Sequence, residues 1–287
     1  MTHEHPVTDA PAANAGGTLW LVATPIGNLG DLAPRAIDVL RNVALVCCED
    51  TRRTGTLLRH AGIRVDRLAV ANDHTEYHRI DDVIGVLGSG GDVAVVSDAG
   101  TPGISDPGER LVAAAIAAGY AVAAVPGPVA AITALTISGL STERFVFDGF
   151  LPRKGRDRVA RLAEVASERR TIVLYEAPHR IERTVADLID ACGADRSVVI
   201  CRELTKRFEQ VVRGRLGSVD LGTPRGEYVI VLAGRPVDDA PVGHDVILAE
   251  LRADRAKGAS TKDAVAAVAD RLGVSKKSVY ALAIADG

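Results

Sequence analysis

The sequence predicts an α/β protein, built from two α/β domains and a small helical module at the C-terminal end. Short apolar runs of strand character alternate with helical stretches, which is typical of parallel sheets covered by helices. Aromatic residues make up only 3% of the chain, so Val, Ala, Leu and Ile must fill the core. The predicted strands lie at 18–24, 44–50, 92–98, 120–125, 171–176, 197–203 and 227–234.

Length, charge and cysteine content limit the classes of function. A chain of 287 residues with 47% hydrophobic residues is long enough for more than one compact domain. The formal net charge is −3 at pH 7, so any affinity for nucleic acid must come from local basic patches. The four cysteines form no CxxC pair and no His stands at metal-ligand spacing, so we predict neither a metal site nor a disulfide framework.

Changes in composition divide the chain into four predicted segments. Residues 1–17 contain neither a basic start nor an apolar stretch, which indicates a disordered tail rather than a signal peptide and favours a cytoplasmic location. An N-terminal α/β domain at 18–138 and a second α/β domain at 139–236 follow. Residues 237–287 predict short helices in which Gly273, Val274 and Ser275 form the turn of a helix-turn-helix, with Ser275 as a helix cap.

One apolar stretch is long enough to cross a membrane. No charged residue occurs between Leu111 and Leu140, but Gly119 and the Pro126-Gly127-Pro128 turn interrupt the run. We therefore predict a helix, a short strand, a turn and a second helix inside the α/β core, and no membrane span.

Small and kinked residues follow the predicted strands, where parallel sheets bind ligands. Gly and Pro at these points allow backbone groups to approach a ligand closely, so several such loops at one edge predict a cleft. The third loop is the most specific, with three glycines, two prolines and two aspartates in twelve residues; its alternative explanation is a rigid turn in which Asp106 caps a helix that begins at Pro107. The four loops are 24–28, 49–52, 97–108 and 126–128.

Common nucleotide and hydrolase motifs are missing. The sequence contains no GxGxxG after its first strand, no GxxxxGK[ST], no HExxH and no GxSxG. Two glycines do follow the first strand in ATPIGNLGD, but their spacing does not fit a pyrophosphate turn, which leaves a dinucleotide site as a weaker alternative.

Seven motifs, in order, resemble those of the tetrapyrrole-methylase-like (class III) methyltransferases, and specifically the branch that methylates small-subunit ribosomal RNA. They run through nearly the whole chain and read LVATPIGNLGD, EDTRRT, SDAGTPGISDPG, VPGP, GFLPRK, YEAPHR and RELTK. The resemblance implies two α/β domains of the tetrapyrrole methylase type, with S-adenosylmethionine in the cleft between them, and a homodimer. It also implies 2′-O-methylation of a cytidine in the decoding region of 16S rRNA in the small ribosomal subunit.

The resemblance also implies which residues bind the cofactor. One position departs from the family, which commonly has Ser where this chain has Val129, so a side-chain contact there is lost. The segment Asn72–Glu76 matches its counterpart in the family only loosely, which puts substrate contacts from that loop in doubt. The implied cofactor-binding residues are Pro25, Asp98, Gly100, Thr101, Val129, Ala130 and Tyr175.

Methyl transfer to a ribose hydroxyl requires few catalytic groups from the enzyme. The methyl group of S-adenosylmethionine is already activated, so the enzyme must chiefly hold the acceptor oxygen in line with it. The hydroxyl is a weak acid, and some group must accept its proton or lower its pKa. Glu176, Glu203 and Lys206 are the candidates; helix capping by Glu176 and a salt-bridged surface around Glu203 and Lys206 are the alternatives.

Basic residues near the predicted cleft are candidates for RNA contacts. The stretch 152–170 carries seven Arg and Lys residues against three acids, and EDTRRT adds two more Arg residues. A basic helix face that only contacts water is the alternative. The predicted RNA-binding residues are Arg52, Arg53, Arg153, Lys154 and Arg180.

Two other functions remain open at this point. A methyltransferase of the same fold would act on a tetrapyrrole or a protein, although GFLPRK, YEAPHR, RELTK and the C-terminal module argue against a porphyrin enzyme. A non-catalytic RNA-binding assembly factor could keep the fold without the activity.

Overall fold

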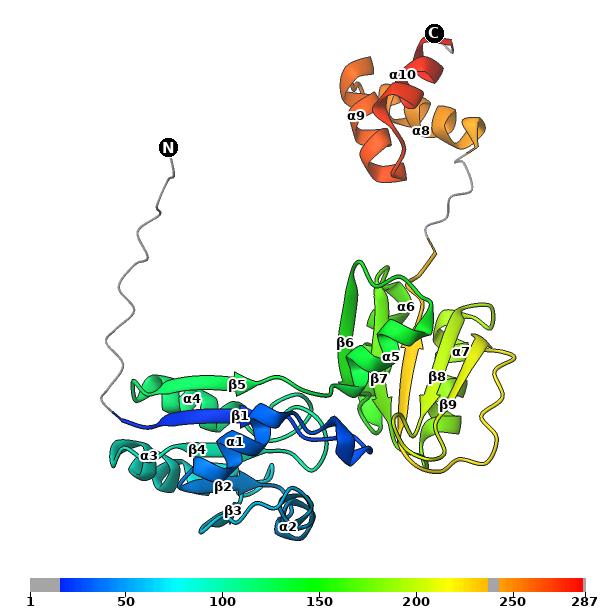
Figure 1. Ribbon diagram of the computed structural model, residues 1–287. Coiled ribbons are helices and arrows are strands. Elements are labelled where there is room, and N and C mark those ends of the chain that lie inside the picture. The colour runs from blue at the N-terminus through cyan, green and yellow to red at the C-terminus, as the bar shows by residue number, and fades with distance from the viewer. Residues whose placement is uncertain (1–15, 237–242, 286–287) are drawn as a thin grey trace, which may run out of the picture. The chain divides into compact units, whose positions relative to one another are not determined.

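The computed structural model describes residues 16–236 and 243–285. The chain divides into two compact units, Met1–Arg235 and Pro236–Gly287, each of which is described by itself (Figure 1). Most of the predicted tail lies outside the described residues, but Gly17 is part of the first unit, because its amide donates to the carbonyl of Leu87.

The first sheet is fully parallel, as the alternation of strands and helices predicts. Its strand order is β3-β2-β4-β1-β5. Strands β2 and β4 are buried at every position, so both faces of the sheet centre are covered, which explains their uninterrupted apolar sequences. The strands are β1 (Thr18–Val22), β2 (Leu45–Cys48), β3 (Leu68–Val70), β4 (Val93–Val96) and β5 (Ala121–Val125).

Helices cover both faces of this sheet. One hydrophobic cluster joins Leu19, Leu45, Leu87 and Leu111, and a second joins Leu40 and other side chains on the opposite face. Because the strands are parallel, each is followed by a crossover that brings the chain back to the same starting edge. The crossovers contain η1 (Leu29–Asp31), α1 (Pro34–Asn42), α2 (Thr51–His60), η2 (Glu76–Arg79), α3 (Ile80–Gly88) and α4 (Glu109–Ala117).

The second sheet is mixed, so the prediction of parallel strands throughout was wrong. Its order is β6-β7-β10-β8-β9, with β10 antiparallel to both β7 and β8. The short loop 203–209 between β8 and β9 permits only an antiparallel pair, since a parallel crossover needs about a dozen residues or more. The strands are β6 (Phe145–Phe150), β7 (Thr171–Glu176), β8 (Ser197–Arg202), β9 (Gln210–Arg215) and β10 (Tyr228–Leu232).

Helix α5 (Ala130–Ser138) belongs with the second sheet. Its buried Ala134 and Leu135 pack on Val173 of β7 and Val229 of β10. The crossing between the two sheets is therefore the turn at 126–129, earlier than the predicted boundary after residue 138. Helices α6 (Gly155–Ser167) and α7 (Ile181–Cys192) pack against a separate cluster.

The apolar stretch 111–140 forms the predicted helix, strand, turn and helix as α4, β5, the Pro-Gly-Pro turn and α5. Across residues 16–236 and 243–285, no helix combines the length and the hydropathy needed to span a bilayer. The four cysteines are unpaired thiols, and burial raises the pKa of Cys47 to about 12.

The start of α4 is capped by a residue that is distant in sequence. The proposed cap, Asp106, is wrong: α4 begins at Glu109, and no side chain of its own segment caps it. Instead, the buried carboxylate of Glu76 accepts from the amides of Gly108, Arg110 and Leu111 at 3.0–3.1 Å. The loop 97–108 is thus held at its far end by a single buried carboxylate.

We expect Glu76→Ala to lower the free energy of unfolding by about 3 kcal/mol, because three buried amides lose their acceptor. Urea titration followed by circular dichroism measures the change. Glu109→Ala is the control, since that glutamate is exposed in the same turn. Equal stability of the two variants would contradict a capping role for Glu76.

The second unit is a three-helix module. It contains α8 (His244–Ala256), α9 (Thr261–Leu272) and α10 (Lys276–Ala285), which share one core. Gly273 ends α9 in the left-handed conformation, and the hydroxyl of Ser275 accepts from the amide of Ser278 at 3.1 Å. The predicted helix-turn-helix connection and its serine cap are confirmed.

Candidate functional site

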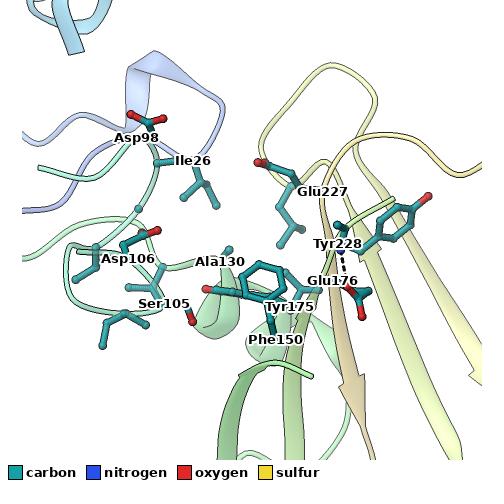
Figure 2. A pocket seen from close by; sticks show the side chains of 18 of the residues that line it. Ile26, Asp98, Ser105, Asp106, Ala130, Phe150, Tyr175, Glu176, Glu227 and Tyr228 are labelled. Carbon is teal, nitrogen blue, oxygen red and sulfur yellow. Dashed lines mark hydrogen bonds between the residues drawn. The ribbon is translucent and has the colours of Figure 1, made fainter. Parts of the chain in front are cut away.

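A cavity of about 500 Å³ lies between the two sheets of the first unit (Figure 2). The loops that follow β1, β2 and β4 form one wall, and β7, β10 and the loop after β8 form the other. Ligand sites in α/β proteins favour this edge of a parallel sheet, and the volume suits a small-molecule cofactor.

The loop 97–108 is fixed in place by backbone contacts with the loop after β1. The amide of Thr24 donates to the carbonyl of Gly100 at 2.8 Å, and the amide of Gly100 donates to Thr24 at 3.0 Å. Gly100 has a φ of +89°, which a side chain would strain. Ser105 has a φ of +61° without being glycine. Backbone held in this way is a feature of binding sites that are formed before the ligand arrives.

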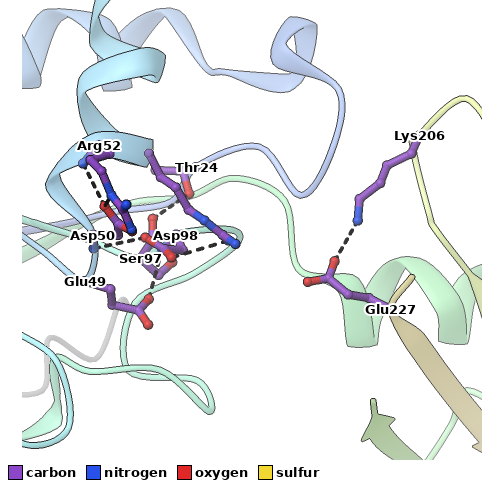
Figure 3. A network of polar contacts seen from close by, with 9 residues as sticks. Thr24, Glu49, Asp50, Arg52, Ser97, Asp98, Lys206 and Glu227 are labelled. Atoms are coloured by element: carbon purple, nitrogen blue, oxygen red, sulfur yellow. Dashed lines mark hydrogen bonds and ion pairs between the residues drawn. The ribbon is translucent and has the colours of Figure 1, made fainter. Parts of the chain in front are cut away.

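Three carboxylates from this wall face the cavity: Glu49, Asp98 and Asp106. Asp98 accepts from the amide of Asp50 and pairs with Arg53, while Glu49 accepts from the amide of Asp98 (Figure 3). Burial is the main cause that raises the pKa of all three groups, that of Asp106 to about 7, and repulsion from neighbouring carboxylates is a smaller contribution. A cavity that concentrates negative charge in this way favours a cationic ligand.

The opposite wall is aromatic and apolar. Tyr175 stands edge-on to Phe147 and Phe150, with ring centroids 4.9 Å and 5.7 Å away. Its hydroxyl accepts from the amide of Ala131 at 3.1 Å, which links β7 to the start of α5. Val129 lines the cavity next to this contact, and its carbonyl accepts from the Thr133 hydroxyl. This wall offers flat apolar contacts, such as a heterocyclic base requires.

Lys206 lies at the mouth of the cavity between two carboxylates. Its ammonium is 2.8 Å from Glu203 and 2.7 Å from Glu227. Burial alone would lower the pKa of Lys206, but the hydrogen bonds to Glu203 and Glu227 outweigh it and raise the pKa. Lys206 is therefore a charged hydrogen-bond donor at neutral pH and not a base.

The loop that carries Lys206 crosses to the first wall under strain. Glu203 and Thr205 both have positive φ, at 52° and 65°. The hydroxyl of Thr205 accepts from the amide of Asn28 at 3.2 Å, and a Cβ on Gly27 would lie 2.3 Å from the Lys206 side chain. Only a glycine at position 27 lets the two loops approach this closely. The contact fixes Lys206 relative to the cavity.

Glu176 is part of a buried network beneath the cavity. Its side chain has no exposed surface, one oxygen pairs with Arg180 at 3.1 Å, and the other accepts from Thr184 at 2.6 Å. Thr184 in turn accepts from Arg158, which pairs with Asp187. Both oxygens of Glu176 are engaged within the protein, so this geometry favours a positioning role over a base.

Six of the seven predicted cofactor-binding residues line the cavity. The exception, Pro25, lies in an adjoining shallower pocket with Arg52 and Arg53. The six are Asp98, Gly100, Thr101, Val129, Ala130 and Tyr175. Of the predicted catalytic residues, Glu176 and Lys206 line the cavity, and Glu203 contacts it through Lys206.

The predicted RNA-binding residues lie in different surroundings. Arg53 lines the cavity and pairs with Asp98 at 3.4 Å, whereas Arg52 lies in the adjoining pocket and pairs with Asp50 at 2.9 Å. Arg153 and Lys154 are exposed just before α6, whereas Arg180 is held between Glu176 and the carbonyl of Leu151.

The basic stretch 152–170 is not a uniform surface. Arg158 is only 4% exposed and binds Asp187, Thr184 and the carbonyl of Pro152. Its assignment to the basic surface was therefore wrong, because it closes the buried network under Glu176.

Three cavity residues were missed as ligand contacts from the sequence. Glu49 lies at the end of the second predicted strand, so the expectation that ligands bind at strand ends could have identified it. Asp106 was considered only as a helix cap. Glu227 precedes its strand. Because β10 runs antiparallel, Tyr228 pairs with Glu176 and Arg202, and the start of β10 meets the ends of β7 and β8. A search limited to the ends of parallel strands could not find it.

Comparison with known proteins agrees with this geometry. Residues 18–220 match the family of tetrapyrrole (corrin/porphyrin) methylases. Two solved structures share the fold: uroporphyrin-III-C-methyltransferase from Thermus thermophilus (TM-score 0.54, 20% identity, 75% of this chain and 94% of that one) and the methyltransferase CobJ (TM-score 0.58, 17% identity, 77% and 97%).

Several curated relatives are more similar in sequence to this chain than the two solved structures are. "Ribosomal RNA small subunit methyltransferase I" of Synechocystis sp. is 45% identical over 94% of this chain and 100% of its own length. The proteins of the same name from Xylella fastidiosa (50%, covering 78% and 84%) and Pseudomonas aeruginosa (43%, covering 94% and 98%) are comparable. The methyl donor of this family is S-adenosylmethionine, which is the cofactor of this chain. The chain belongs to the tetrapyrrole (corrin/porphyrin) methylase family and, within it, to the ribosomal RNA small subunit methyltransferase I group.

Proposed function

We propose that this chain transfers a methyl group from S-adenosylmethionine to the 2′-oxygen of a cytidine in the decoding region of 16S rRNA, in the small ribosomal subunit. The observation that carries the proposal is the cavity itself, with an acidic wall, an apolar wall and a cationic Lys206 at its mouth, in a chain 40–50% identical to proteins named for small-subunit rRNA methylation.

The residues present fit the cofactor. S-adenosylmethionine supplies an electrophilic methyl group on a sulfonium cation. Asp98, Glu49 and Asp106 provide negative charge for its cationic groups. Tyr175 and Val129 provide the apolar contacts that its adenine requires.

The pH dependence of cofactor binding follows from Asp106. Its pKa is raised from 3.8 to about 7, so the neutral carboxyl stabilises the ligand-free fold below pH 4, and this contribution is lost as the pH rises through about 7. A cationic cofactor binds the ionised carboxylate, so we expect its affinity to increase between pH 6 and 8, by up to about tenfold for each unit by which binding lowers that pKa. Calorimetry across this range measures the trend. Asp106→Asn should bind with a flat profile, and an equally steep profile in that variant would contradict the assignment.

The acceptor hydroxyl needs a group that lowers its pKa. Lys206 is protonated and faces the cavity, so in this proposal it donates to the 2′-oxygen and stabilises the developing negative charge. Glu203 and Glu227 hold the ammonium in place. Glu227 is 71% exposed and has one oxygen not engaged by Lys206, so in this proposal it receives the hydroxyl proton and passes it to solvent.

Features of the protein surface support an RNA substrate and a homodimer. Arg52, Arg53, Arg153 and Lys154 are the proposed phosphate contacts, because they are exposed or lie at the cavity mouth. The proposed homodimer is supported by exposed apolar side chains on α5 and β6, namely Ile132, Ile137 and Phe145. We also propose a cytoplasmic location, with which an rRNA substrate is compatible.

The test is transfer of labelled methyl to small ribosomal subunits that lack the modification, followed by nuclease digestion and mass analysis of the nucleosides. A 2′-O-methylated cytidine is the expected product. Cofactor binding without transfer to subunits would reject the rRNA substrate in favour of a small molecule or a protein. Absence of cofactor binding would leave only the assembly-factor function.

A further inference from the structure

The three-helix module lies outside the part of the chain that the family shares. The family match ends at residue 220, and a quarter of this chain lies outside its alignments with the two solved methyltransferases, although those enzymes are covered over 94–97% of their own length. The alignment with the Synechocystis relative covers 94% of this chain, so it must include at least part of the module. The cavity takes all of its lining from residues 26–229. The module therefore follows a unit that contains all of the residues lining the cavity.

The module has a core of its own, which leaves the outer face of α10 free. Val279 and Ala283 of α10 are buried against Leu251 of α8 and Val268 of α9. On the other side of the helix, Lys276, Lys277, Tyr280 and Ile284 are exposed at helical spacing; we call this set the α10 face. Tyr280 is 52% exposed and Ile284 is 61% exposed, so both side chains are accessible on this face.

The charges of the module are distributed unevenly. Asp254 and Glu250 are engaged by Arg271, and Lys257 also reaches Asp254 at 3.7 Å. The ammonium groups of Lys276 and Lys277, by contrast, have no ion-pair or hydrogen-bond partner within 243–285. They stand in the first turn of α10, where the helix dipole adds to their positive potential.

We propose that the α10 face is a docking surface for the phosphate backbone and an unpaired base of the RNA substrate. Two unpartnered lysines complement phosphates, and an exposed tyrosine one turn further along the helix provides a ring on which a base can stack. The inference rests on the proposed function, since it assigns the module to the same RNA. In this proposal the module acts in RNA binding and not in the chemistry.

The experiment uses the full-length double variant Lys276→Glu/Lys277→Glu with small ribosomal subunits at several salt concentrations. We expect KM to rise about tenfold at low salt, kcat to stay within about twofold, and the slope of log affinity against log salt to fall by about one for each lysine. Lys257→Glu is the charge control, because that lysine is already paired with Asp254. Tyr280→Ala should raise KM with little change in the salt slope. All substituted side chains are exposed, and thermal unfolding checks that each variant is folded.

The outcomes separate this inference from the proposed function. If wild-type protein methylates the subunits but the double variant matches Lys257→Glu in KM and salt slope, the docking surface is rejected while the proposed function stands. If the double variant binds deproteinised 16S rRNA as wild type does but binds subunits weakly, the face contacts a ribosomal protein, and the RNA assignment is overturned. If wild type transfers no methyl to rRNA, the proposed function itself fails.

Discussion

Lys206→Met should reduce methyl transfer on the order of 100-fold while leaving cofactor affinity nearly unchanged. The substitution keeps the aliphatic stem that packs on Gly27 but removes the ammonium that Glu203 and Glu227 hold at the cavity mouth. In the proposed function this ammonium stabilises the negative charge that develops on the acceptor oxygen. Its loss should therefore lower kcat more than it weakens cofactor binding. Single-turnover transfer and calorimetry with S-adenosylmethionine measure the two quantities separately.

The matched control is Arg207→Met, which removes a positive charge from the next position. Arg207 is exposed and its guanidinium lies over Phe208, away from the two glutamates. Glu227→Gln removes the proposed proton acceptor but keeps the ammonium, which Glu203 still positions, so its loss of activity should be smaller than that of Lys206→Met. Full activity of a folded Lys206→Met protein would exclude Lys206 from the reaction and direct attention to the acids of the opposite wall.

Glu176→Ala should destabilise the protein by about 3–5 kcal/mol, because it removes a fully buried carboxylate and leaves the partly buried guanidinium of Arg180 without its partner. The side chain is fully buried and also accepts from Thr184, which is joined to Arg158 and Asp187. A loss of this size corresponds to a fall in Tm of about 10 °C or more. Differential scanning calorimetry of the ligand-free protein measures it.

Glu182→Ala, at an exposed position in the first turn of α7, is the control for this prediction and should change Tm by less than about 2 °C. Glu176→Gln keeps an acceptor for Thr184 and should fall between the two. If Glu176→Ala kept the wild-type Tm but lost methyl transfer, the residue would act on the substrate, and its assignment to the buried network would be wrong.

Most of the strands that the sequence predicted are largely buried, although the edge strand β5 was also predicted, from its apolar run. Strands such as β2, β4 and β10 are continuous apolar runs, so their burial is visible in the residues themselves. The missed strands β3, β6 and β9 are short or half-exposed at sheet edges. Their strand conformation comes from hydrogen bonds to a neighbouring strand, which no local pattern records.

Some residues of the candidate site could be predicted from the sequence, and others could not. Asp98, Gly100, Thr101 and Tyr175 were predictable because small or kinked residues at strand ends, together with ordered motifs, leave a local signature. Glu227 was not, because its place at the cavity depends on the antiparallel course of β10.

By itself, the sequence determined the α/β class, the strand-end loops that form one wall of the cavity, and the helix-turn-helix connection of the module, because each depends on residues close together in the chain. Only the tertiary structure decided which charged groups are available to a ligand. Arg158 and Arg180 belong to a buried network, Glu76 caps a helix from another segment, and Lys206 is held between two carboxylates. Charge pairing depends on distances between segments far apart in sequence, and composition or periodicity does not encode those distances.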